Sequence, residues 1–257
     1  GTAYYFQAQA WHHFGSSWSE PHWFVTLNSL PFREDFETLA PGPLHLRNGW
    51  QSAPHEAAEV LHAGAPGSAG QLAAVVSEGR IVQKFCESSS ATNIVWTDML
   101  LRPARALTSD PGDTLVLRPL DEEVTGSAIF YVDYLTGIVV AHDGLEPVAL
   151  HHVPPLAGDA WARFTVRSDY RTRTWGLWLN GHNIAGDLRF ANSAQSRFVE
   201  LAFEETGPTP MLVDNLSIEL EWPGRPPGIT MVDTDGDGIC DDWERDVFGS
   251  LDVATGD

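Results

Sequence analysis

Between residues 32 and 222 the chain alternates short apolar and β-branched runs with Gly, Pro, Asn and Asp. This pattern is typical of antiparallel strands and turns, and helical periodicity is scarce. Within 161–170 (WARFTVRSDY) the odd positions hold Trp, Arg, Thr and Arg, whereas the even positions hold Ala, Phe, Val and Ser. One face of this strand is therefore predicted to be buried and the other wet. Strands are predicted at 34–39, 71–77, 93–103, 127–134, 137–143, 161–170, 174–185, 197–205 and 211–220.

The segment 174–185 (TWGLWLNGHNIA) contains two strand-like runs joined by Asn180-Gly181. This dipeptide is preferred in two-residue type I′ turns, in which both central residues have positive φ. The segment is therefore predicted to be a tight β-hairpin.

Residues 1–31 are unusually aromatic and contain the apolar patches AYYFQAQAW and HWFVTL. Such a segment is too apolar to be a solvated tail. We expect it to be buried, either as edge strands on its own domain or as a strand donated to a neighbouring molecule.

Four sequence motifs in residues 32–220 resemble the concanavalin A-like, laminin G-like jelly-roll superfamily. They are DFE at 35–37, W-x-x-F-x-V at 161–166, W-x-L-W-L-N-G at 175–181 and V-D-N-L-S-I at 213–218. The resemblance implies an antiparallel jelly-roll β-sandwich over 32–221. It also implies a second, structural cation where the first and last strands meet, for which Asp35, Glu37 and Asp214 are candidates. The alternative is that these acids end strands or bind backbone N–H groups.

The formal net charge of −20 disfavours nucleic acid and anionic membrane surfaces as partners. Residues 233–257 contain nine carboxylates and one Arg, so they form a distinct acidic module. The Pro- and Gly-rich segment 222–232 begins with WPGRPPG and is predicted to be a stiff linker to this module.

The segment 233–244 (DTDGDGICDDWE) has the spacing of a calcium-binding loop. Carboxylates occupy positions one, three, five, nine and twelve, and Gly238 allows the sharp turn. The predicted Ca²⁺ ligands are Asp233, Asp235, Asp237, the carbonyl of Ile239, Asp241 and Glu244. The loop resembles those of thrombospondin type 3 repeats and dockerin-like modules. The fold class predicted for the whole chain is thus all-β, with a short C-terminal calcium loop and helix in 233–257.

The two cysteines, Cys86 and Cys240, are far apart in sequence. An even count in an acidic chain with a calcium loop favours one disulfide in an oxidising compartment, and the alternative is two unrelated thiols. A Cys86–Cys240 bridge would fix the calcium loop onto the sandwich.

Catalytic motifs are not evident in the sequence: it contains no H-E-x-x-H, no G-x-S-x-G and no phosphate-binding glycine loop. We therefore expect the protein not to be an enzyme. Ten tryptophans raise the question of sugar stacking, for which Trp161, Trp175 and Trp178 are the candidates, although core packing is the alternative for each.

These features predict a calcium-stabilised extracellular protein with a structural or adhesive role, joined to other copies or matrix components by strand addition. The alternative is a carbohydrate-binding module that recognises a polysaccharide. The chain begins at Gly1 without Met, which fits a secreted or cell-surface protein after removal of its signal peptide. No run approaches the roughly 18–20 apolar residues of a membrane span, so no membrane insertion is expected.

Overall fold

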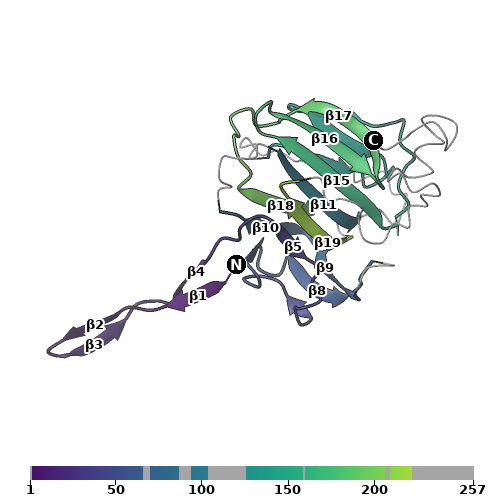
Figure 1. The fold of residues 1–257 in the computed structure, drawn as a ribbon. Coiled ribbons are helices and arrows are strands. Elements are labelled where there is room, and N and C mark those ends of the chain that lie inside the picture. The colour runs from purple at the N-terminus through teal and green to yellow at the C-terminus, as the bar shows by residue number, and fades with distance from the viewer. Residues whose placement is uncertain are drawn as a thin grey trace.

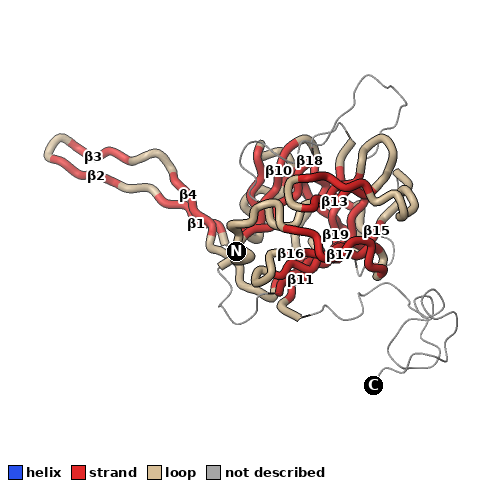
Figure 2. The backbone as a smooth tube through the Cα atoms, turned by 90° about the horizontal axis from the view of Figure 1, so that it is seen from above, coloured by secondary structure: helices blue, strands red, loops and turns tan. Residues whose placement is uncertain are grey.

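The computed structural model describes residues 2–65, 70–86, 94–103, 126–158, 160–205 and 209–221, except the side chains of His12 and Trp23. All regular elements in these ranges are β-strands (Figure 2). Their bounds are β1 Ala3–Phe6, β2 Gln9–His12, β3 Gly15–Trp18, β4 His22–Val25, β5 Phe32–Glu34, β6 Gly42–Pro43, β7 Trp50–Ala53, β8 Ala58–His62, β9 Leu72–Val76, β10 Gly79–Lys84, β11 Ile94–Arg102, β12 Phe130–Val132, β13 Val139–Asp143, β14 Glu146–Ala149, β15 Ala162–Asp169, β16 Thr174–Leu179, β17 His182–Arg189, β18 Glu200–Glu205 and β19 Met211–Glu219.

The largest sheet has nine strands in the order β17-β16-β15-β11-β19-β9-β8-β6, with β5 also paired to β19 (Figure 1). Every pairing between named strands is antiparallel in the described part of the chain. Strands distant in sequence lie side by side, as β11 does between β15 and β19. Such crossed connections are a property of jelly-roll sandwiches.

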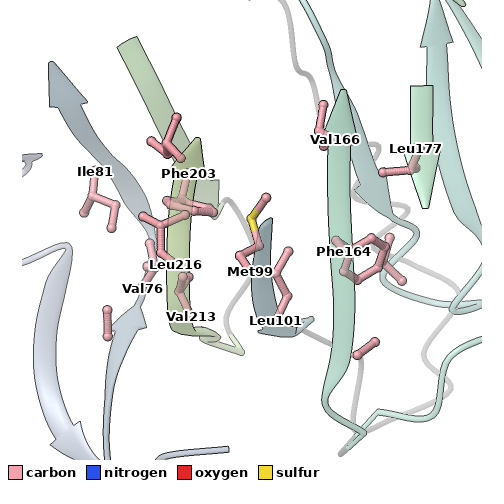
Figure 3. Packing of buried hydrophobic residues seen from close by; sticks show 14 of the residues in the cluster. Val76, Ile81, Met99, Leu101, Phe164, Val166, Leu177, Phe203, Val213 and Leu216 are labelled. Carbon is pink, nitrogen blue, oxygen red and sulfur yellow. The ribbon is translucent and has the colours of Figure 1, made fainter. Parts of the chain in front are cut away.

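Two three-stranded sheets, β18-β10-β7 and β12-β13-β14, pack with the large sheet around one hydrophobic core. Figure 3 shows Met99 of β11 and Phe164 of β15 from the large sheet, and Ile81 and Phe203 from the β18-β10-β7 sheet. The β12-β13-β14 sheet contributes Val132, Val139 and Ala141 to the same cluster. The described body is therefore a β-sandwich, as the sequence predicted.

Most strands predicted from the sequence are present, but the segment 34–39 is a turn. The Glu34 carboxylate accepts the N–H of Phe36 at 3.0 Å, and the Asp35 carboxylate accepts the N–H of Glu37 at 3.1 Å. Phe36 also has a φ of +62°, which a strand does not allow. The strand therefore ends at Glu34, and Phe36 turns into the core, where it is fully buried.

The hairpin at Asn180-Gly181 is confirmed. These residues have φ values of +51° and +87°, as a type I′ turn requires, and they join β16 to β17. The structure thus confirms the local geometry that this dipeptide predicts.

In the described residues, no helix has the length and apolar character needed to cross a bilayer. The predicted C-terminal helix and the linker 222–232 lie outside the described residues.

Candidate functional site

A two-stranded arm, which we define as residues 2–26, projects from the sandwich (Figures 1 and 2). Strand β1 pairs with β4 and β2 pairs with β3, so this segment folds back on itself. Its base is closed by Thr2 and Thr26, whose backbones hydrogen-bond at 2.9 Å. From Asn28 onward the chain joins the body, because Asn28 donates its N–H to the carbonyl of Lys84.

A bulge divides the arm into two halves. Two residues separate Phe6 from Gln9, whereas three separate Trp18 from His22 on the return strand. The hydroxyl of Ser19 supports the extra residue by accepting the N–H of Ala8 at 3.0 Å and donating to the carbonyl of Glu20. The irregularity is therefore held by local hydrogen bonds of Ser19.

Aromatic side chains of the arm are exposed over its whole length. Tyr4 stacks on Phe24 with ring centroids 5.2 Å apart, and Phe6 lies 6.4 Å from Phe24, so these three rings form an aromatic ladder on one face. Exposed fractions are 48% for Tyr4, 69% for Tyr5, 53% for Phe6, 76% for Trp11, 85% for Phe14, 60% for Trp18 and 51% for Phe24. Contiguous exposed apolar surface of this kind marks interaction sites.

Of the two alternatives expected for residues 1–31, edge strands on the same domain are not seen for the arm, and donation to a neighbouring molecule stays a prediction. The strands of the arm are neither added to an edge of the sandwich in the same chain nor single strands with wholly unpaired backbones. Each strand has one partner inside the arm and one edge that pairs with no other described strand, so the arm offers its aromatic faces and its backbone edges.

A second candidate surface is formed by Trp96 and Trp178 on the outer face of the large sheet. The two indoles come from β11 and β16, which flank β15, and their centroids are 5.4 Å apart. A Cβ at Gly176 would lie 3.0 Å from the Trp178 ring, so only glycine leaves this ring its full space. The indoles therefore meet above β15 and form an aromatic platform, the name we use for this pair.

A buried ion pair lies on the same face of the sheet as the platform. Arg163 donates from both Nε and Nη2 to the carboxylate of Asp98, and Thr165 donates its hydroxyl to Asp98 at 2.6 Å. The side chains of Arg163 and Asp98 are only 4% and 2% exposed. Alternation placed Arg163 and Thr165 on the wet face of their strand, so that part of the prediction is wrong. Both residues do lie on the predicted face of β15, but they are buried there.

Arg167 borders the platform, with its guanidinium carbon 6.0 Å from the Trp96 ring centroid. It also pairs with Asp169 at 3.1 Å. Burial acts to raise the pKa of Asp169, but the N–H groups of Thr172 and Arg171 and the Arg167 charge hold it below its usual range. The carboxylate is thus kept ionised next to the platform.

The three predicted sugar-stacking tryptophans have different environments. Trp175 is 1% exposed and donates its indole N–H to the carbonyl of His142, so it lies in the core and offers no face to a sugar. Trp161, just before β15, and Trp178 are half-buried. Trp96 was missed by sequence reasoning, although strand alternation would have placed it on the same face as Asp98.

The predicted second metal site is not assembled as a carboxylate cluster. Glu37 accepts the N–H of Leu72 at 2.6 Å, and Asp214 accepts the N–H of Ala65 at 2.9 Å. Asp35 is engaged in the turn described above. The described ranges contain no group of three or more His, Cys, Asp or Glu side chains arranged to hold a metal ion. These acids bind backbone, which was the alternative.

The predicted calcium loop and Cys240 lie outside the described residues. Cys86 is exposed and its thiol is free, with Sγ 3.8 Å from the carbonyl oxygen of Leu27. The Cys86–Cys240 bridge stays a prediction.

No protein-family model and no curated protein sequence matches the chain. Among solved structures, a sialidase aligns with 80% of this chain and 20% of its own at 11% identity and a TM-score of 0.51. This chain therefore spans about a fifth of the sialidase. An alginate lyase in complex with an alginate tetrasaccharide aligns with 76% of this chain and 98% of its own, at 12% identity and a TM-score of 0.46.

An endo-1,3-beta-glucanase from Streptomyces sioyaensis aligns with 73% of this chain and 94% of its own, at 13% identity and a TM-score of 0.43. Of these three, only the sialidase exceeds a TM-score of 0.5. At such low identity the likeness concerns architecture alone. The jelly-roll β-sandwich is the conclusion it supports.

Proposed function

We propose that this protein is a non-catalytic structural or adhesive module of an extracellular or cell-surface assembly, which self-associates through its aromatic arm. The observation that carries the proposal is the arm, where seven aromatic side chains are 48–85% exposed. An isolated two-stranded hairpin is at best marginally stable in water, and so is a hairpin that projects from its domain without packing on it. A partner that covers the arm would bury its aromatic side chains and stabilise the hairpin.

Sedimentation velocity of the full chain tests this function. The comparison uses the triple substitution Tyr4→Ser, Phe6→Ser and Phe24→Ser, which we call the arm variant. We expect the wild-type chain to associate at micromolar concentration and the arm variant to sediment as a monomer. A wild-type chain that stays monomeric at every concentration contradicts the proposal.

The matched control changes two exposed aliphatic residues on the body. Leu145 and Val148, in the β13–β14 hairpin, are 57% and 40% exposed. The double variant Leu145→Ser, Val148→Ser should associate like the wild type. If it also becomes monomeric, the loss of association is not specific to the arm.

Calcium is the cofactor of this proposed function, bound by the loop 233–244. Its support is the carboxylate spacing in the sequence, since six to eight oxygen ligands are what Ca²⁺ requires. Calorimetric titration of the full chain with CaCl₂ should show a site that is lost in the variant Asp235→Ala, Asp237→Ala. Equal binding by both chains would contradict this assignment.

A second candidate function is polysaccharide binding, favoured by the aromatic platform. Indole faces stack on the apolar faces of sugar rings, and the partly exposed guanidinium of Arg167, which the buried Asp169 carboxylate holds, supplies hydrogen-bond donors at the platform's border. Glycan-array binding by the wild-type chain should be lost in Trp178→Ala and retained in Trp18→Ala, a variant of the arm. No glycan bound by the wild type would exclude this candidate.

A further inference from the structure

We propose that the arm of one molecule packs against the arm of a second copy, so that association closes as a two-fold dimer and does not propagate as a filament. This inference rests on the proposed function, because it specifies which surface the arm contacts. The surface that the arm contacts is a second arm, and not a neighbouring sandwich or an edge strand.

The distribution of exposed apolar side chains supports arm-to-arm contact. Every large aromatic side chain reported as exposed in the described residues belongs to the arm. The large hydrophobic residues exposed on the described body are all aliphatic, and they are scattered over several elements: Leu61, Leu135, Leu145, Val148 and Val199. Apart from the half-buried Trp96–Trp178 platform, the described part of the body has no aromatic patch, whereas a second arm presents the same exposed rings.

The distribution of charge also favours contact between two arms. Glu20 is the only Asp, Glu, Lys or Arg residue of the arm, so of the formal charge of −20 the remainder of the chain carries −19. An arm docked on a neighbouring body would displace water from a highly charged surface, which costs free energy. Contact between two nearly neutral arms desolvates few charged groups and keeps the acidic bodies apart.

The exposed area is sufficient for a stable dimer. With about 200 Å² for each aromatic side chain, the exposed fractions of the seven aromatic side chains correspond to roughly 900 Å² per arm. Specific interfaces bury about 800 Å² per partner. Tyr4, Phe6 and Phe24 supply roughly 300 Å² of this, and Tyr5 lies on the opposite face, so two arms reach that size only if they wrap around each other and cover both faces.

The arrangement of the rings explains why the assembly would stop at a dimer. Tyr4, Phe6 and Phe24 lie on one face of β1–β4, as cross-strand or diagonal neighbours. An aromatic face that packs on an identical face forms an isologous contact related by a two-fold axis. Both copies then use the same ladder, so that face is not left for a third molecule. A contact between an arm and a different surface would instead be heterologous and open-ended.

Fluorescence-detected sedimentation of mixtures tests the inference. Labelled arm variant, whose body is unchanged, is mixed with unlabelled wild-type chain over a concentration range. We expect the wild type alone to reach twice the monomer mass and no more, and the labelled arm variant to remain monomeric with dimerisation weakened at least tenfold. Urea unfolding of both chains verifies that the body is equally stable.

Two results would overturn the inference. If the wild-type chain binds the labelled arm variant and raises its sedimentation coefficient, the arm docks on a body. If the wild type forms a concentration-dependent series of larger species, the contact is open-ended. Both results leave the proposed self-association intact, whereas a wild-type chain that is monomeric at all concentrations overturns the proposed function and this inference together.

Discussion

The arm and the β16–β17 hairpin both carry tryptophans on paired strands but differ in what their aromatic residues contact. Both are antiparallel pairs with tryptophans on their strands. Trp175 of the hairpin is 1% exposed, whereas Trp11 of the arm is 76% exposed. The hairpin is one edge of a sheet that packs on two others, and the arm has no second layer in the described residues. The comparison shows that strand formation and burial are separate outcomes.

The largest difference should appear on truncation of a core aromatic. Phe164 of β15 is fully buried and stacks on Phe130 with centroids 5.0 Å apart. Phe164→Ala leaves a cavity and should lower the free energy of unfolding by about 3–5 kcal/mol in urea titrations. A loss under 1 kcal/mol would mean that the sandwich core is not packed as described.

The buried ion pair of the body should be almost as sensitive. Asp98→Ala leaves the Arg163 guanidinium buried without its partner, so we expect a loss of about 3 kcal/mol. The double variant Asp98→Leu, Arg163→Met removes both charges and should recover most of this loss. Double-mutant-cycle measurements by urea unfolding check this, and additive losses would contradict a coupled pair.

A smaller effect is expected at the turn of the body hairpin. Gly181 has a φ of +87°, a conformation in which a Cβ is strained. Gly181→Ala should therefore cost about 1–2 kcal/mol. Asn180→Gly, which keeps the turn permissive, serves as the control and should change the free energy of unfolding much less.

The pH dependence of stability should also belong to the body. Burial lowers the pKa of His142, and burial together with the positive charge of His55 lowers the pKa of His45. Between these lowered values and the unfolded value of about 6.5, the unfolded chain binds more protons than the folded chain. Stability should therefore fall as the pH drops below about 6.5.

A substitution at His142 isolates its contribution. His142 is 2% exposed, and neither ring nitrogen has a hydrogen-bond partner. His142→Phe removes the titrating group and should flatten the fall in stability between pH 7 and pH 5, as followed by thermal unfolding at each pH. An unchanged pH profile would contradict the role of this histidine.

The smallest effect on stability is expected in the arm. Phe14 at its tip is 85% exposed, so Phe14→Ala should change the free energy of unfolding by less than about 0.5 kcal/mol. A loss comparable to that of Phe164→Ala would show that the arm packs on the sandwich in solution and would remove the contrast between the two regions.

The sequence was informative wherever a feature depends on neighbouring residues. Alternation of side chains predicted β15, and the Asn180-Gly181 dipeptide predicted the turn between β16 and β17. Both signals are contained within a short segment of the chain. The segment 34–39 was misassigned because the carboxylates of Glu34 and Asp35 bind nearby N–H groups and compete with strand pairing.

Candidate site residues were harder to predict because their environment depends on distant strands. Trp175 and Trp178 are three residues apart, yet one lies in the core and the other meets Trp96 from a different strand. Nothing in either segment alone specifies which face will be covered. Likewise, the carboxylate of Asp98 reaches Arg163 only because β11 and β15 are paired.

By itself, the sequence determined that the body is an all-β sandwich and that a tight hairpin forms at Asn180-Gly181. Only the tertiary structure decided that the segment of residues 2–26 pairs with itself as an exposed arm, and that two indoles from different strands meet on the face that holds a buried ion pair. The physical reason is the separation along the chain over which each effect acts. Strand and turn preferences act between neighbours along the chain, whereas burial depends on which surfaces the completed fold brings together.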